Sequence, residues 1–139
     1  MSETLHMNER DTVRIVRESP EVLELEAEWA PGGTPPPAHL HPEQEERFVF
    51  QSGRMRAVID GEERVLEPGD MVVIPPGTVH QMWNEGEEPV RGRWETRPAL
   101  RTAEWFRRMD ALNVGGTRQP PVEDLIKAVQ EYGDVFRLA

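Results

Sequence analysis

The chain has 139 residues, no cysteine and a formal net charge of -10 at pH 7. This length suits one folded domain with its own core, and the lack of cysteine excludes disulfides, thiolate nucleophiles and thiolate metal ligands. The acidic charge argues against nucleic acid or an anionic membrane as a partner. No segment has the length of a membrane span, and the first residues lack the basic start and apolar run of a signal peptide, so we expect a cytoplasmic protein.

The N-terminal third predicts two strands. Residues 1–10 are polar, and we expect them to be frayed or used by a partner subunit, with His6 solvated. Residues 11–17 and 21–30 alternate between apolar and polar side chains, which is typical of half-buried strands. In the second of these, three glutamates occupy the polar face, and a solvated outer face explains them better than a cation site.

Two histidines follow a loop rich in proline and glycine. The loop covers residues 31–37, and His39 and His41 come directly after it. Because side chains two positions apart on a strand point to the same face, these two imidazoles are predicted to point the same way.

The next strand, residues 45–51, carries a choice between two carboxylates. Glu46 shares its face with Phe48 and Phe50, whereas Glu45 lies on the other face. The apolar face must be the inner one, so Glu46 is the candidate ligand and Glu45 is predicted to be exposed.

Further strands are predicted at 54–59, 62–66 and 71–74. Asp60-Gly61 joins the first two as a two-residue hairpin of type I′.

A third histidine opens the strand after the turn at residues 75–77. His80 shares a face with Met82 and Asn84. We interpret Met82 as packing in the wall and Asn84 as a residue that ties the turn through backbone hydrogen bonds.

The last predicted strand, residues 90–96, places Trp94 inward. A basic cluster begins on this strand, but acidic neighbours interleave with it, so we interpret it as a solvated face rather than an anion site. Its members are Arg91, Arg93, Arg97 and Arg101.

From residue 101 the apolar period becomes helical. Thr102 is predicted to cap a first helix, and Pro121 suits the first turn of a second one. The helices and the tail after them carry apolar side chains that need burial, among them Trp105, Phe106, Leu125 and Phe136.

The spacing of residues 33–84 resembles the two signature motifs of the cupins, small β-barrel proteins of the germin-like type. The first motif is matched by Gly33, His39, His41, Glu46 and Gly53, and the second by Gly69, Pro75, Gly77, His80 and Asn84. The resemblance implies an all-β fold, a cupin double-stranded β-helix (jelly-roll) barrel over residues 1–100. Residues 101–139 then form a helical appendage of the same domain, packed on the barrel or in a dimer interface. The exposed barrel edges, the apolar appendage and the resemblance together predict a homodimer.

Three imidazoles and one carboxylate could converge on one divalent transition metal per chain, with His39, His41, Glu46 and His80 as ligands. Four protein ligands in an octahedral site leave two positions free, which suits iron, manganese, nickel or cobalt, and zinc fits a tighter site. The sequence does not choose among these metals. A purely structural ion is the alternative.

The resemblance implies two kinds of enzyme and one other class. The first is a dioxygenase, and the second is a Lewis-acid isomerase, cyclase or lyase, with Glu46 as the catalytic base in either case. A non-catalytic small-molecule-binding protein is the third possibility. The inferred pocket residues are apolar and aromatic, which favours a small unsaturated or aromatic substrate over a phosphosugar. They are Phe48, Phe50, Met82 and Trp94.

Overall fold

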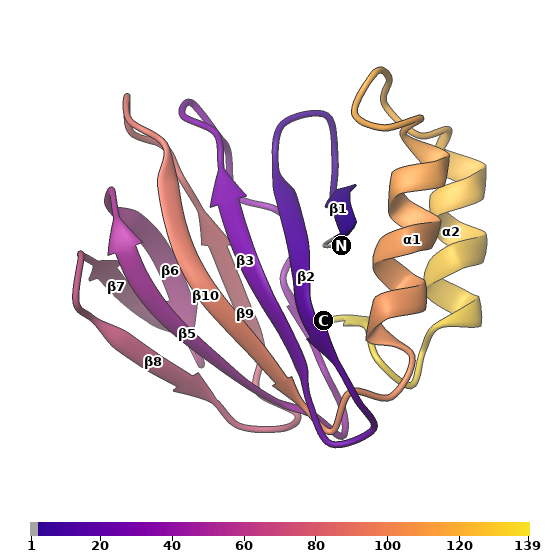
Figure 1. Ribbon diagram of the computed structural model, residues 1–139, viewed down its shortest axis with the longest axis horizontal. Coiled ribbons are helices and arrows are strands. Elements are labelled where there is room, and N and C mark those ends of the chain that lie inside the picture. The colour runs from indigo at the N-terminus through magenta and orange to yellow at the C-terminus, as the bar shows by residue number, and fades with distance from the viewer. Residues whose placement is uncertain (1–2) are drawn as a thin grey trace.

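Two antiparallel sheets enclose the core of the barrel (Figure 1). The computed structural model describes residues 3–139. The larger sheet has the strand order β1 (Glu3–His6), β2 (Thr12–Glu18), β3 (Leu23–Trp29), β10 (Val90–Arg97), β5 (Glu45–Ser52) and β8 (Met71–Ile74). The smaller sheet has the order β11 (Arg137–Leu138), β4 (His39–Leu40), β9 (His80–Trp83), β6 (Met55–Ile59) and β7 (Glu62–Leu66). The predicted all-β barrel with a helical appendage is therefore confirmed.

Alternation along the strands builds the core. Along β3, every second side chain is buried, and Leu23 and Leu25 are fully enclosed. The strand β5 follows the same rule with Glu46, Phe48 and Phe50 inward. The carboxylate of Glu46 thus lies on the otherwise apolar inner face of β5.

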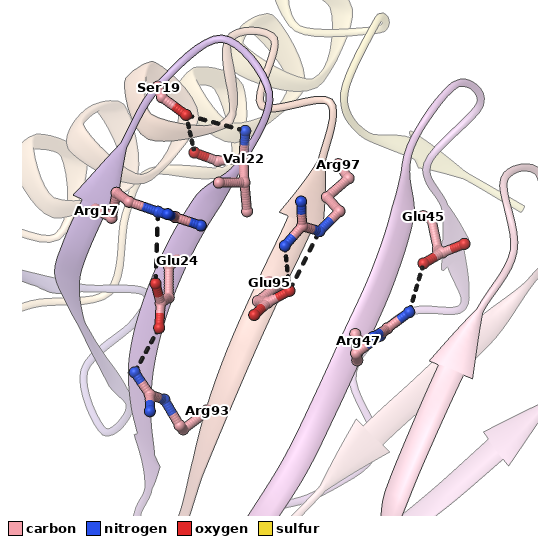
Figure 2. A network of polar contacts seen from close by, with 9 residues as sticks. All are labelled: Arg17, Ser19, Val22, Glu24, Glu45, Arg47, Arg93, Glu95 and Arg97. Carbon is pink, nitrogen blue, oxygen red and sulfur yellow. Dashed lines mark hydrogen bonds and ion pairs between the residues drawn. The ribbon is translucent and has the colours of Figure 1, made fainter.

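The outer face of the larger sheet is charged, as the glutamates of β3 predicted. Figure 2 shows Glu24 between Arg17 and Arg93, with the Arg97–Glu95 pair, 3.0 Å apart, on the neighbouring strand. Further pairs across this face are Arg14–Glu26 and Arg91–Glu28. Such exposed pairs contribute little stability each, and they account for the strand members of the basic cluster. The fourth member lies elsewhere, since Arg101 pairs with Asp134 of the C-terminal segment at 3.0 Å.

The prediction of a frayed N-terminus is wrong for the described residues. β1 pairs with β2 along its whole length. The backbone of His6 is also held by α1 and the turn after it, because its N–H donates to Asp110 and its carbonyl accepts from Asn113, each at 2.9 Å. His6 is half-buried rather than solvated. Met1 and Ser2, the rest of the segment expected to fray, lie outside the described residues.

The two helices, α1 (Thr102–Leu112) and α2 (Val122–Glu131), lie side by side next to β1 (Figure 1). Thr102 is the first helical residue rather than the cap, and its hydroxyl accepts a hydrogen bond of 2.8 Å from Gln44. The same buried amide also donates to the carbonyls of Pro98 and Ala99. This amide ties α1 to the start of β5. No helix among residues 3–139 is long and apolar enough to span a membrane.

Several apolar side chains of the appendage pack within their own chain. Phe106 is 4% exposed and meets the Trp94 ring edge-on at 5.4 Å, and Trp105 stacks on Phe136 at 4.7 Å. Val122 and Ile126 of α2 nevertheless stay exposed, at 70% and 52%. The homodimer stays a prediction.

The Asp60-Gly61 hairpin has positive φ angles of 51° and 79°, as a type I′ turn requires. Gly53 also has a positive φ, of 80°, but its surroundings differ. A Cβ at Gly53 would lie 2.5 Å from the Pro89 carbonyl oxygen, whereas a Cβ at Gly61 would meet nothing within 4 Å.

This contrast gives a matched pair of variants. Gly61→Ala carries only the cost of a left-handed backbone, about 1 kcal/mol in the free energy of unfolding. Gly53→Ala adds a collision with backbone, which costs a further ~1–3 kcal/mol. Urea unfolding of both variants measures the difference. Equal losses would contradict the close packing of Gly53 against the 89–90 segment.

Candidate metal centre

Three histidines from the smaller sheet converge inside the barrel. His39 lies in β4 and pairs directly with His80, which opens β9, and His41 follows β4. One ring nitrogen of each lies within 4.8 Å of the other two. The structure therefore brings together the three imidazoles whose spacing suggested a common site.

The carboxylate of Glu46 reaches the same point from the opposite sheet. Its Oε1 lies 3.0 Å from Nε2 of both His41 and His80. Its Oε2 accepts a hydrogen bond of 2.8 Å from Nε1 of Trp94 on β10. Trp94 was predicted only as an apolar wall. Its inward position was visible in the sequence, but its hydrogen bond depends on the register between β10 and β5.

Each imidazole is oriented through its Nδ1 by a backbone carbonyl. The partners are Pro37 for His39 at 3.2 Å, Thr78 for His80 at 2.9 Å and Val135 for His41 at 2.6 Å. Because a carbonyl only accepts, each Nδ1 carries a hydrogen, and in the neutral form of each ring Nε2 has its lone pair available. Proteins usually orient a metal-ligating histidine in this way, through a hydrogen bond from the ring nitrogen that does not bind the metal.

The donor set fits a divalent metal ion. Among the described residues, the buried atoms without a hydrogen-bond partner include Nε2 of His41 and Oε1 of Glu46, which lie 3.0 Å apart. Buried polar atoms without partners are costly, and a shared cation would satisfy both. Three neutral nitrogens with one carboxylate oxygen match the preferences of first-row transition metals.

The cluster also shifts the protonation of its members. Burial, with the neighbouring charges of His80 and His41, lowers the pKa of His39 to about 4. Burial acts to lower the pKa of His41 as well, but the Glu46 carboxylate and the Val135 carbonyl outweigh it, so this pKa is raised. Burial acts to raise the pKa of Glu46, but His41 and His80 hold it well below its usual range. Without a metal, the raised pKa of His41 and the lowered pKa of Glu46 both favour a buried ion pair between the two side chains.

A cavity of about 540 Å³ adjoins the centre and is shared by the three histidines and Glu46. Of the predicted pocket residues, Phe48, Met82 and Trp94 line it, whereas Phe50 does not. Phe50 points inward, but it lies further along β5 opposite Gly92 and packs on Trp29. Walls that were not predicted come from β3 and from the C-terminal appendage: Trp29, Trp105, Phe106, Met109, Val135 and Phe136.

Two other predicted residues lie where the alternation placed them. Glu45 sits on the outer face near Arg47, at 3.6 Å (Figure 2), with its side chain 39% exposed. Asn84 is buried and donates to the carbonyls of Trp29 and Glu88. It ties the turn as expected and does not reach the centre through these bonds.

Fold and site together define a small β-barrel protein with an internal cluster of three histidines and one carboxylate. Residues 25–94 match the sequence profile described as Cupin domain. That match covers half of the chain, and the chain belongs to the cupin family.

Individual relatives match over shorter stretches. An oxidoreductase of Pestalotiopsis fici, iacF, is 45% identical over 53 residues, which are 37% of this chain and 26% of that protein. A gentisate 1,2-dioxygenase of Ralstonia sp is 31% identical over 68 residues, 49% of this chain and 18% of that protein. The matched stretch thus spans about a quarter or less of each relative. Among solved structures, an RmlC-like cupin from Shewanella frigidimarina superposes with a TM-score of 0.66 at 16% identity, covering 74% of this chain and 89% of that one.

Removal of one ligand tests the site. We expect one divalent metal per chain in the wild type, and we expect His41→Ala and His80→Ala to lose it after mild chelation while the barrel stays folded. Elemental analysis measures the metal content and circular dichroism the fold. Glu45→Gln is the matched control and should retain its metal, because Glu45 lies on the outer face. Full metal occupancy in both histidine variants would contradict the proposed metal site.

Metal affinity should also depend on pH. The raised pKa of His41 means that its proton must leave before Nε2 can bind a metal, so affinity should fall as pH decreases from 8 to 6. His39, with a pKa of about 4, stays neutral over this range and adds no further proton. Cobalt(II) titrations followed by visible absorption, with released protons counted by an indicator dye, measure both effects. An affinity that is constant between pH 8 and pH 6 would contradict the ion pair.

Proposed function

We propose that this chain is a metal-dependent dioxygenase that acts on a small unsaturated or aromatic molecule. The observation that carries the proposal is the position of Glu46, which lies among three histidines at the wall of an apolar cavity and is held by Trp94. His39, His41, Glu46 and His80 would hold a divalent metal, which would supply a Lewis acid beside which an ionised substrate and dioxygen could meet.

The residues of this chain then have distinct tasks. The aromatic walls, with Trp29, Phe48 and Trp94 among them, orient a planar molecule and exclude water from the site. Glu46 accepts the proton of an enol or phenol as the substrate binds. The carboxylate is ionised at neutral pH, because His41 and His80 hold its pKa below the usual range, so it carries no proton of its own when the substrate binds.

Trp94 positions this base. Its N–H occupies Oε2 and thereby leaves Oε1 directed toward the histidines. Asp11 is the other carboxylate among the described residues that line the cavity, but both of its oxygens accept hydrogen bonds, from the Ala30 N–H and from Asn8. Glu46 is therefore the better proton acceptor. In a dioxygenase both atoms of dioxygen enter the product, so the reaction needs no further reductant.

The named relatives support an oxidative reaction, since one is an oxidoreductase and another a gentisate 1,2-dioxygenase. A second candidate is a Lewis-acid isomerase, cyclase or lyase. It is supported by the same Glu46, because proton transfer beside a polarised carbonyl needs no oxidant. Non-catalytic binding of a small molecule is the third, supported by the largely apolar cavity. A cytoplasmic location and a homodimer also remain parts of the proposal.

An oxygen-electrode screen of phenolic and enolisable compounds, with the iron(II) and manganese(II) forms, tests the first candidate. Oxygen uptake should match product formation one to one. Glu46→Gln should weaken the metal site and lower turnover by about two to four orders of magnitude, the usual contribution of a positioned base. Glu45→Gln is the control and should retain turnover.

Assays with and without dioxygen distinguish the two enzymatic candidates. Turnover that continues unchanged under nitrogen would exclude the dioxygenase and favour the Lewis-acid reaction. Unchanged turnover in Glu46→Gln would exclude Glu46 as the base in both.

A further inference from the structure

The last residues of the chain contact two of the three histidines. The carbonyl of Val135 accepts the 2.6 Å hydrogen bond from Nδ1 of His41. The ring of Phe136 stacks on the ring of His39, with centroids 4.8 Å apart and planes 20° apart. Figure 1 shows this segment returning from α2 toward the barrel. Residues more than 90 positions along the chain from the histidines thus set the orientation of both.

The segment also supplies part of the backbone around His39. The strand β4 has only two residues and pairs with β9 at a single position, His39 opposite His80. On its other edge β11 pairs with both residues of β4, and the N–H of Ala139 donates to the Ala38 carbonyl at 3.0 Å. Without β11, the strand that carries His39 would have little backbone pairing.

The segment is itself anchored on the appendage. Asp134 pairs with Arg101, and Val135 and Phe136 both donate to the Tyr132 carbonyl. The Phe136 ring lies against Trp105 as well, 4.7 Å away and 16° from parallel. Phe136 therefore has one ring neighbour on α1 and another in the candidate centre.

We propose that residues 134–139, the C-terminal strap, are a positioning element of the metal centre, so that docking of the strap and binding of the metal are coupled. The inference rests on the proposed metal site but not on the reaction assigned to it. The Val135 carbonyl fixes the tautomer and the rotation of His41, and Phe136 with β11 fixes His39. By thermodynamic linkage, a bound metal must stabilise the docked strap by as much as the docked strap strengthens metal binding.

The coupling predicts two reciprocal effects. Phe136→Ala, which keeps the backbone of the strap, should weaken cobalt(II) binding about 10-fold, and a chain ending at Gly133 should weaken it by up to about 100-fold, the range seen when the outer contacts of ligating histidines are removed. Ile126→Ala, on α2 outside the strap, is the control. Its side chain is 52% exposed, so cobalt affinity should not change. Thermal unfolding of the metal-free variants separates a loss of affinity from a loss of fold.

The second effect is measured on the wild-type protein. Adding cobalt(II) should slow hydrogen exchange at the amides of 135–139 by about the factor that strap removal costs in affinity. The amides of β7, which pairs only with β6, serve as the reference, because global stabilisation would slow both regions. If the strap only packs on the barrel, cobalt(II) should slow hydrogen exchange at 135–139 no more than at β7.

The outcomes are distinct. Cobalt binding that is equal in wild type, Phe136→Ala and the truncated chain, with no change in exchange at the strap, would overturn the inference while leaving the metal site in place. A wild type that binds no cobalt would overturn both the metal site and the inference. Loss of affinity in Phe136→Ala together with metal-dependent protection of the strap would establish the coupling, even if the truncated chain failed to fold.

Discussion

The buried contact between Glu46 and the imidazoles of His41 and His80 is the constraint on which the centre of this barrel depends. A carboxylate that is 1% exposed would be strongly destabilising in an apolar core without a compensating charge or ion. Here one oxygen accepts from Trp94 and the other faces two imidazoles at 3.0 Å. The carboxylate comes from one sheet and the imidazoles from the other, so the interaction also fixes how the two sheets face each other.

The same contact explains why the centre suits a cation better than a simple ion pair. Nε2 of His41 and Oε1 of Glu46 lie 3.0 Å apart, yet neither atom has a hydrogen-bond partner. A divalent ion could accept lone pairs from all three imidazoles and the carboxylate at once. The surrounding aromatic wall keeps the dielectric low, which strengthens charge interactions within the centre and requires that each charge be compensated.

The appendage and the N-terminal strand complete the barrel in ways that connect distant parts of the chain. Gln44 ties the start of β5 to α1, and β1 is held by Asp110 and Asn113 at the other end of that helix. α1 in turn carries Trp105, on which Phe136 stacks. α1 and the segment after α2 therefore close one side of the cavity.

Sequence by itself determined the strand faces and the residues that could meet at the centre. Alternation with a period of two requires His39 and His41 to point together and separates Glu46 from Glu45, and the structure places each of them accordingly. Most strand boundaries follow for the same reason, because turn residues such as Asp60-Gly61 mark where the alternation stops.

Only the tertiary structure decided which distant groups meet. The register between strands decided that Trp94 reaches Glu46 and that Phe50 lies off the cavity wall. The path of the last residues decided which carbonyl orients His41. A local pattern specifies the face of a side chain, but it carries no information on the partner that the fold brings to that face.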